Sequence, residues 1–423
     1  MSRYALIPDQ VWDGLSERPQ PDKAVIVEGD LITSVIDSAR VPPDVDRVSL
    51  PGCTLLPGLI DAHVHFCDWM RPAFLAAGVT TIRDVGNDLA FILERRRFAQ
   101  THPRQSPRIL CCGPLLDGPT AHWPLMGRAH ADRVAMEASV ESLVEHRVDA
   151  IKLYVNITAE QMAGAASVSH RHGLHLLAHL GGITAPDAAT MGVDEVEHLT
   201  GCAAAWKTSA VEELDALCDV LLTHGMVMCP TLVVWDRIGR VCEPAFPHDR
   251  RLVWVHPDFR EAWRHYPWRH ADPINRLNLQ RSVVEMKRCL ARMQERDLSI
   301  ITGSDTPFPY LIPGFSLHDE LALMVDAGLK PLDALRAATS QAARVLRVDG
   351  VVGTVEPGKQ ADLLAVHGDP TADITAIANV AQVVKQGVLL KPDALRRLAR
   401  RLHAKSPDDP VSRDILGYIE KNR

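Results

Sequence analysis

Apolar residues in the middle of the chain follow two alternating patterns. Short, continuous apolar runs of strand length are followed by longer stretches in which apolar residues recur at helical spacing. This alternation is typical of strand–helix units around a parallel sheet, because the strands of such a sheet are buried on both faces. Eight apolar runs are found, at residues 55–66, 78–86, 108–116, 150–155, 175–181, 195–199, 226–232 and 299–305.

Helical patterns separate most of these runs. They cover residues 131–147, 158–172, 207–224 and 275–296. Eight strand–helix units predict an α/β fold, a (β/α)₈ TIM barrel over residues 57–346, with an open, doubly wound sheet as the alternative. No Gly-x-Gly-x-x-Gly or P-loop sequence follows any run, which disfavours the nucleotide-binding form of that alternative.

The two ends of the chain carry a different pattern. Residues 1–56 and 347–390 contain short strand-like runs separated by Gly, Pro and Asp. Neither set can bury a face alone, so we expect both ends to form one small β-sandwich domain. Residues 391–423 hold nine basic and five acidic side chains, with leucines at helical spacing. They predict a basic helical tail that docks on the acidic body or on a neighbouring subunit.

Composition narrows the classes of function. The 423 residues are 46% hydrophobic and carry a formal net charge of −7, which argues against a nucleic-acid partner. The nine cysteines show no Cys-x-x-Cys spacing, which favours reduced thiols. No signal-peptide pattern and no apolar run of 18 residues occurs. We therefore expect a cytoplasmic homo-oligomer without a membrane partner, acting on a small molecule.

Metal-binding residue types lie at the ends of several predicted strands. Because the carboxyl ends of barrel strands meet at one mouth, these side chains are expected to converge there. His63 and His65 are two residues apart on one strand and so point the same way, as two ligands of one ion need to do. Histidine and carboxylate ligands suit zinc and similar divalent ions. The converging residues are His63, His65, Lys152, His179, His198 and Asp305.

Lys152 differs from the other five because an ammonium group has no lone pair to offer a cation. By itself it is a lysine that extends from a strand end to solvent. Surrounded by metal ligands, it fits only if its charge is removed or reversed. Reaction of the amine with CO₂ produces a carbamate whose two oxygens can bridge two metal ions.

The order of these residues, together with longer motifs, resembles the amidohydrolase superfamily. The motifs are PGLIDAHVH, GVTTIRDVG, TGSD, LRAATSQAARVL and GTVEPGKQADLLAVHGDP, and they are most similar to the imidazolonepropionase-like and Xaa-Pro dipeptidase-like branch. The resemblance covers nearly the whole chain. It implies a (β/α)₈ barrel with a flanking β-sandwich, and a binuclear metal centre with N-carboxylated Lys152.

The resemblance also implies a role for each ligand. His63, His65 and Asp305 would hold the more buried ion, His179 and His198 the other, and carboxylated Lys152 would bridge the two. Zn²⁺ is expected, with Mn²⁺, Co²⁺ or Fe²⁺ as alternatives. A metal-bridging hydroxide would attack an amide-type C–N bond, and Asp305 would pass its proton to the leaving amine.

The chain departs from the dipeptidase pattern near the fifth strand. A tyrosine that commonly lies two residues beyond the strand-5 histidine is replaced by Gly181. Tyr154 points to the same side as Lys152 and either supplies the missing oxyanion donor or packs against a neighbouring strand. His122, in the turn-rich segment after the third strand, either contacts substrate or is an ordinary solvated histidine.

A long segment after the seventh strand, residues 235–273, is rich in aromatic side chains. We expect a loop that acts as a lid with an apolar wall, and the alternative is a helical excursion packed on the barrel or on another subunit. Its arginines are placed to meet a substrate carboxylate. The aromatic residues are Trp235, Phe246, Trp254, Phe259, Trp263, Tyr266 and Trp268, and the arginines are Arg250, Arg251, Arg260, Arg264 and Arg269.

Three functions fit these features. The first is a hydrolase that cleaves an amide, carbamate, urea or dipeptide bond in a small substrate with an apolar or aromatic portion. The second is a lactonase or phosphotriesterase-like hydrolase with the same metals. The third is a non-catalytic structural relative, which the presence of all six ligand positions disfavours.

Overall fold

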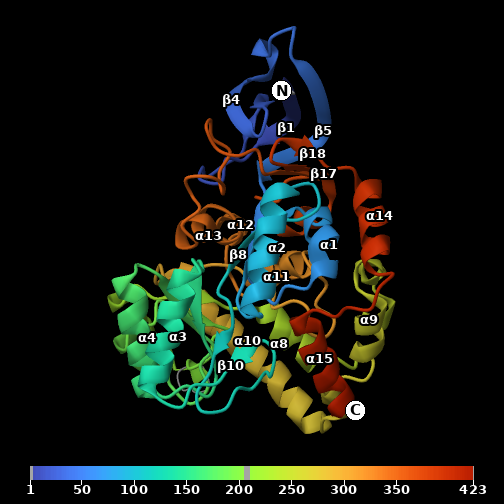
Figure 1. The fold of residues 1–423 in the computed structure, drawn as a ribbon. Coiled ribbons are helices and arrows are strands. Elements are labelled where there is room, and N and C mark those ends of the chain that lie inside the picture. The colour runs from blue at the N-terminus through green and yellow to red at the C-terminus, as the bar shows by residue number, and fades with distance from the viewer. Residues whose placement is uncertain (1–2, 204–209, 423) are drawn as a thin grey trace.

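The computed structural model describes residues 3–203 and 210–422. Strands from the two chain ends form one lobe, and helices surround the parallel strands of a larger lobe (Figure 1). The parallel strands belong to two sheets, one of three strands in the order β6-β7-β8 and one of seven in the order β10-β9-β11-β12-β13-β14-β15. Their bounds are β6 Leu59–Val64, β7 Val79–Asp84, β8 Arg108–Cys111, β9 Leu115–Leu116, β10 Gly127–Arg128, β11 Ala150–Leu153, β12 His175–Ala178, β13 Glu195–Glu197, β14 Val227–Cys229 and β15 Ser299–Ile300.

Backbone hydrogen bonds connect the two parallel sheets at both edges. Ala62 N donates to Thr302 O at 2.9 Å on one side, and Asp149 N donates to Cys111 O at 2.8 Å on the other. The arrangement is of the TIM-barrel type, and each of the eight predicted runs contains a strand. Within the described part of the chain the strands form two ladders rather than one continuous ladder, so full closure stays a prediction.

Helices follow most of the parallel strands. The predicted helices at 131–147, 158–172 and 275–296 are present, and that at 207–224 is present from residue 211, after the undescribed residues 204–209. Asp132, Thr158 and Asp272 cap three of these helices by accepting backbone N–H hydrogen bonds. The barrel helices are α1 Arg71–Ala76, α2 Leu89–Thr101, α3 Arg133–Glu145, α4 Ala159–Arg171, α5 Ala185–Thr190, α7 Val211–Thr223, α8 Leu232–Gly239, α10 Pro273–Glu295, α11 Phe315–Asp326, α12 Pro331–Ala337 and α13 Ser340–Val345.

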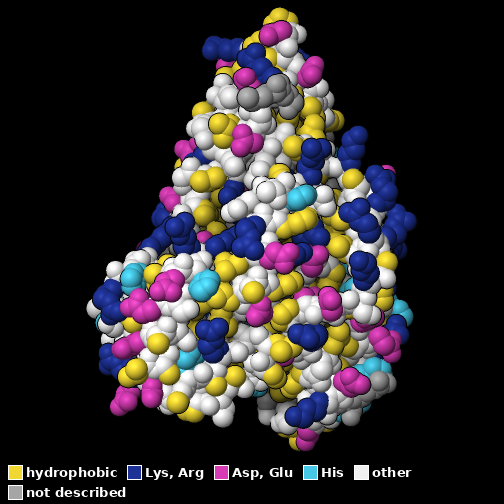
Figure 2. All heavy atoms as spheres, viewed as in Figure 1, with side chains coloured by type: hydrophobic (Ala, Val, Ile, Leu, Met, Phe, Trp, Pro, Cys, Tyr) yellow, Lys and Arg dark blue, Asp and Glu magenta, His cyan; other side chains and the backbone are white. Residues whose placement is uncertain are grey.

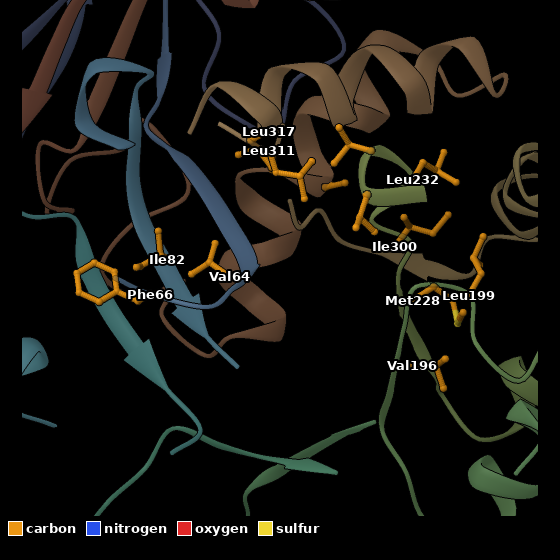
Figure 3. Close-up of a cluster of buried hydrophobic side chains, with 14 of the residues drawn as sticks. Val64, Phe66, Ile82, Val196, Leu199, Met228, Leu232, Ile300, Leu311 and Leu317 are labelled. Atoms are coloured by element: carbon orange, nitrogen blue, oxygen red, sulfur yellow. The ribbon is translucent and has the colours of Figure 1, made fainter. Parts of the chain in front are cut away.

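The core of the larger lobe lies between the strands and these helices. Val64 and Ile82 come from β6 and β7, while Val196, Met228 and Ile300 come from β13, β14 and β15 (Figure 3). All five are almost fully buried, and each apolar side chain removed from water contributes about 1.5–3 kcal/mol. This core keeps the strand ends in fixed positions.

Strands from both chain ends share a third sheet, in the order β18-β17-β16-β5-β1-β3-β4, with β2 paired to β1. The N-terminal β5 pairs antiparallel with the C-terminal β16, so the two ends meet as predicted. A two-layered sandwich stays a prediction. The bounds are β1 Arg3–Val11, β2 Gln20–Pro21, β3 Lys23–Glu28, β4 Leu31–Asp37, β5 Asp46–Pro57, β16 Leu363–His367, β17 Val380–Lys385 and β18 Val388–Leu389.

The segment at residues 235–273 is helical, which corrects the expectation of a loop. It contains the end of α8, α9 (Pro257–Trp263) and several single 3₁₀ turns. Phe259 and Trp263 are fully buried, because the apolar side of α9 packs into the core. The alternative of a helical excursion on the barrel is therefore supported, and a lid motion stays a prediction.

The basic tail forms two helices, α14 (Pro392–Leu402) and α15 (Pro410–Lys421). Leu395 and Leu398 of α14 are buried against the body, while Lys and Arg side chains gather on its outer side (Figure 2). None of the described helices combines the length and the apolar character needed to cross a membrane.

A buried ion pair joins two C-terminal segments of the terminal sheet. Lys385 Nζ lies 2.5 Å from Asp362 Oδ2, and both side chains are 1% exposed. Asp362 Oδ1 also accepts a hydrogen bond from Gln386 N at 2.7 Å. Burial lowers the pKa of Lys385, and the carboxylate of Asp362 opposes that change.

We predict that Lys385→Met lowers the free energy of unfolding by about 3–5 kcal/mol, because it leaves the buried Asp362 carboxylate without its counter-charge. The double variant Lys385→Met/Asp362→Asn should regain part of that loss, since it removes both charges. Urea denaturation of the metal-free protein measures both. A loss below about 1 kcal/mol for the single variant would contradict the prediction.

Candidate metal centre

All eight residues predicted for the site line one cavity of about 170 Å³. The structure thus brings together side chains that are far apart in sequence, at the carboxyl ends of the parallel strands. Their roles as ligands and catalytic groups stay predictions. The eight residues are His63, His65, His122, Lys152, Tyr154, His179, His198 and Asp305.

The backbone places these side chains at strand ends. His63 and Lys152 lie on β6 and β11, and His179 and His198 directly follow β12 and β13. Asp305 lies five residues beyond the short β15, and its N–H donates to His63 O at 2.8 Å. His198 and Asp305 have φ values of 61° and 57°. Such left-handed conformations cost about 1–3 kcal/mol each and cluster at functional sites.

Three of the histidines have one ring nitrogen occupied. His63 Nδ1 lies 2.6 Å from Glu197 Oε2, His65 Nδ1 lies 3.1 Å from Gly86 O, and His198 Nδ1 contacts Thr231 Oγ1. A hydrogen bond at Nδ1 leaves the Nε2 lone pair of a neutral imidazole available. Metal-ligating histidines are commonly held in this way.

Several buried polar atoms in the cavity have no hydrogen-bond partner among the described residues. His63 Nε2 and Asp305 Oδ1 are 3.3 Å apart, and His65 Nε2 is 3.4 Å from the same oxygen. Ligand atoms of His63, His198 and Asp305 lie within 4.8 Å of one another. Leaving a buried polar atom unpaired costs about 1–3 kcal/mol, and a cation would satisfy several of them at once. The residues present therefore fit a metal.

The protonation states of His179, His198 and Asp305 also suit metal binding. Burial and the adjacent Lys152 lower the pKa of His179 to about 3. Burial, with His63 beside it, lowers the pKa of His198 well below its usual value. Burial by itself would raise the pKa of Asp305, but His198 and contacts with His63 and His65 hold it well below normal. At neutral pH the two imidazoles are neutral and Asp305 is ionised.

A second layer of buried charge supports the site and was missed from the sequence. Glu197 Oε1 lies 3.5 Å from Lys152 Nζ and 3.6 Å from Arg83 Nη2, and all three residues are buried. Arg83 Nη1 in turn donates to Glu195 Oε2 at 3.0 Å. The available signal was two glutamates in a buried run that ends in His198, and an arginine within the apolar run at residues 78–86.

Helix α8 holds His198 from the other side. Leu232 N and Val233 N, at its first turn, donate to the buried carboxyl of Glu320 at 2.9 and 2.7 Å. These two bonds satisfy N–H groups that the helix leaves unpaired, while burial raises the pKa of Glu320 to about 8. Trp235 Nε1, further along α8, donates to His198 O at 3.2 Å.

Tyr154 lines the cavity and also packs against the core, so both interpretations of this residue stay open. Its hydroxyl accepts a hydrogen bond from Trp123 Nε1 at 3.1 Å, so its own proton remains available to another acceptor. Burial raises the pKa of Tyr154, which keeps the phenol protonated. His122 is exposed at the cavity rim, and its ring lies 6.0 Å from that of Tyr154.

The predicted arginine contacts with substrate are wrong for the described cavity. None of the five arginines between 250 and 269 belongs to its described lining. Arg251 pairs with Asp249 and Asp319 instead, and Arg269 donates to Val241 O. The reason is that this segment is largely helical and places Trp235 and Tyr266, two of its aromatic residues, at the cavity.

Comparison with known proteins places this site in a family. A model of the amidohydrolase family matches residues 54–390. The chain belongs to the amidohydrolase family. It is accordingly a hydrolase that acts on C–N bonds, in a family that typically uses metal ions. A search of curated protein sequences found no significant match.

Solved structures agree with this family at the level of the fold. Bottromycin amidohydrolase is 24% identical, with a TM-score of 0.76 over 97% of this chain and 92% of that one. A Xaa-Pro dipeptidase with bound methionine is 21% identical, with a TM-score of 0.72 over 92% of this chain and 100% of that one. Ochratoxinase from A. niger is 17% identical, with a TM-score of 0.71 over 92% of this chain and 95% of that one.

We predict that Glu197→Gln weakens Zn²⁺ binding about 10–100-fold, because His63 loses the carboxylate that orients its ring. Competition with a fluorescent zinc chelator measures the dissociation constant. Glu212→Gln, at an exposed position on α7, is the matched control and should bind Zn²⁺ as the wild type does. An unchanged affinity in Glu197→Gln would show that the Glu197 contact does not support a metal.

Proposed function

We propose that the protein is a binuclear metal-dependent hydrolase that cleaves an amide-type C–N bond in a small substrate with an apolar or aromatic portion. The bond belongs to an amide, carbamate, urea or dipeptide. The observation that carries the proposal is the convergence of four histidines, Lys152 and Asp305 on one buried cavity. Membership of the amidohydrolase family supports the same reaction class.

The candidate ligands divide into two sets from neighbouring strands of the barrel. His63, His65 and Asp305 would hold one divalent ion, and His179 and His198 would hold the other. Lys152 is buried, and its Nζ has no hydrogen-bond partner among the described residues. A free ammonium there would repel cations, whereas a carbamate formed with CO₂ has two oxygens to share between them. Arg83, close to Glu197, offsets the negative charge that this reaction adds.

Each remaining residue has a defined task in hydrolysis. Two divalent ions, with Zn²⁺ as the proposed species, supply a hydroxide at neutral pH and polarise the scissile carbonyl when bound. Asp305 is ionised, so it accepts the proton released during attack and delivers it to the leaving nitrogen. The Tyr154 hydroxyl donates to the carbonyl oxygen as negative charge develops there. His122, at the rim, contacts the substrate.

The cavity wall supports a substrate with an apolar portion. Its outer part consists largely of aromatic side chains, while Lys152 is the one lysine or arginine in the described lining. This composition favours neutral amides over zwitterionic dipeptides. Two proteins of similar fold are named as a bottromycin amidohydrolase and an ochratoxinase. A cytoplasmic location and a homo-oligomeric state stay part of the proposal.

A substrate screen tests the reaction class. The protein, loaded with Zn²⁺ and bicarbonate, is incubated with N-acyl amino acids, X-Pro dipeptides, aryl amides, carbamates and ureas. Release of an amine supports the proposal. Turnover of lactones or phosphotriesters alone would favour the second function, and turnover of nothing in the panel would favour the non-catalytic relative.

We predict that Lys152→Ala lowers kcat at least about 100-fold, because the carbamate that joins the two ligand sets cannot form. Metal analysis should find about two ions per chain in the wild type and fewer in the variant. Lys330→Ala, which removes an exposed lysine, should retain both ions and full activity. A Lys152→Ala variant that stays active and binds two ions would show that Lys152 does not bridge the metals.

A further inference from the structure

The C-terminal helix α15 reaches the cavity, although it lies more than 100 residues beyond Asp305 in the sequence. Tyr418 of α15 belongs to the cavity lining, and its ring centroid is 5.5 Å from that of Trp123. Val411, Ile415 and Ile419 are buried on the same side of the helix as Tyr418. The helix packs beside α9 (Figure 1). Its position is therefore set by packing rather than by one contact.

An acidic side chain of α15 also holds a cavity loop. Leu125 N and Met126 N donate to Asp414 Oδ2 at 2.9 and 2.8 Å. At the other end of the loop, Asp117 accepts from His122 N at 2.8 Å. The loop of residues 117–126 is thus held at both ends by carboxylates. Trp123 lies between these two points.

Trp123 connects the loop to the reacting groups. Its Nε1 donates to the Tyr154 hydroxyl, and its ring is 6.1 Å from that of Phe308 in the cavity wall. Displacement of the 117–126 loop would both break the hydrogen bond from Trp123 to Tyr154 and open the aromatic wall of the cavity. The geometry therefore couples α15 to the wall and to Tyr154.

We propose that α15 is a specificity element of the active site. Tyr418 and Trp123 form the surface that takes the aromatic or bulky apolar group of the substrate. Asp414 is a positioning residue that holds the 117–126 loop, and with it Trp123 and Tyr154. This inference rests on the proposed function, since it names the substrate class that the cavity accepts.

Aromatic chemistry accounts for the selection. Tyr418 is partly exposed, so its ring retains surface for a ligand. Aromatic pairs at centroid separations of about 4.5–7 Å gain about 0.5–1.5 kcal/mol beyond the burial of their area. A substrate with an aryl group would gain this binding free energy from contact with Tyr418 and Trp123, and a substrate with a methyl group in its place would not.

A matched pair of amides tests the role of Tyr418. N-acetyl-L-phenylalaninamide and N-acetyl-L-alaninamide share the amide group and differ in the aryl ring, and quenching of tryptophan fluorescence in the metal-free protein reports binding. We expect Tyr418→Ala to raise the Kd of the phenylalanine amide about tenfold and that of the alanine amide less than about twofold. Tyr418→Phe should bind both amides as the wild type does.

Two results would overturn the role of Tyr418. One is a wild-type protein that does not prefer the phenylalanine amide, and the other is a Tyr418→Ala variant that keeps the wild-type preference. Hydrolysis by the metal-loaded protein is measured separately, as ammonia released from the carboxamide or as acetate and primary amine released from the acetyl amide. If the protein binds the phenylalanine amide selectively but hydrolyses neither amide, the proposed reaction is rejected and the role of α15 in specificity is retained. If it hydrolyses the amides without a preference that depends on Tyr418, the reaction is retained and the role of α15 is rejected.

Asp414→Ala tests the positioning role. It should increase hydrogen exchange in residues 117–126 and lower kcat for both amides by a similar factor, because Tyr154 loses its partner. Asp414→Asn keeps one carbonyl acceptor, so its hydrogen exchange in residues 117–126 and its kcat should lie between those of Asp414→Ala and the wild type. Asp408→Ala, an exposed site in the same tail, is the control. Unchanged exchange in the loop of Asp414→Ala would overturn the role.

Discussion

Buried charge at the carboxyl ends of the parallel strands is the constraint on which the rest of the structure depends. Glu197, Arg83 and Lys152 are all removed from water, and His63 is held against Glu197 at 2.6 Å. An unpaired charge in such surroundings is strongly destabilising, so each group requires a partner in a fixed geometry. The packed strands and helices supply that geometry, and the unpaired atoms left at the centre are those that a divalent cation would satisfy.

The surrounding elements act through these groups. Helix α8 is held at its first turn by Glu320 and holds His198, while the 117–126 loop holds Tyr154 through Trp123. The left-handed conformations of His198 and Asp305 persist because the neighbouring backbone and side chains determine them. The barrel helices, the 235–273 segment and the tail therefore all contribute to one site.

Much of the site was predictable because metal chemistry restricts the residue types and the barrel restricts their places. Six ligand candidates at strand ends, and Tyr154 beside one of them, were enough to predict that they meet. Glu197 and Arg83 were missed because an ionised residue in a short buried strand has no pattern that separates it from an exposed one. The arginines of the 235–273 segment were misplaced because charge by itself does not say which side of a helix faces the cavity.

The sequence by itself determined the parallel strand–helix architecture, the meeting of the two chain ends in one sheet, and the set of candidate ligands. These features follow from the periodicity of apolar residues and from residue chemistry, and both can be read from short stretches of the sequence. Only the tertiary structure decided that residues 235–273 are largely helical, that Tyr418 lines the cavity and that Asp414 holds the 117–126 loop. These depend on packing between segments far apart in the chain, and no local pattern records which buried surfaces will meet.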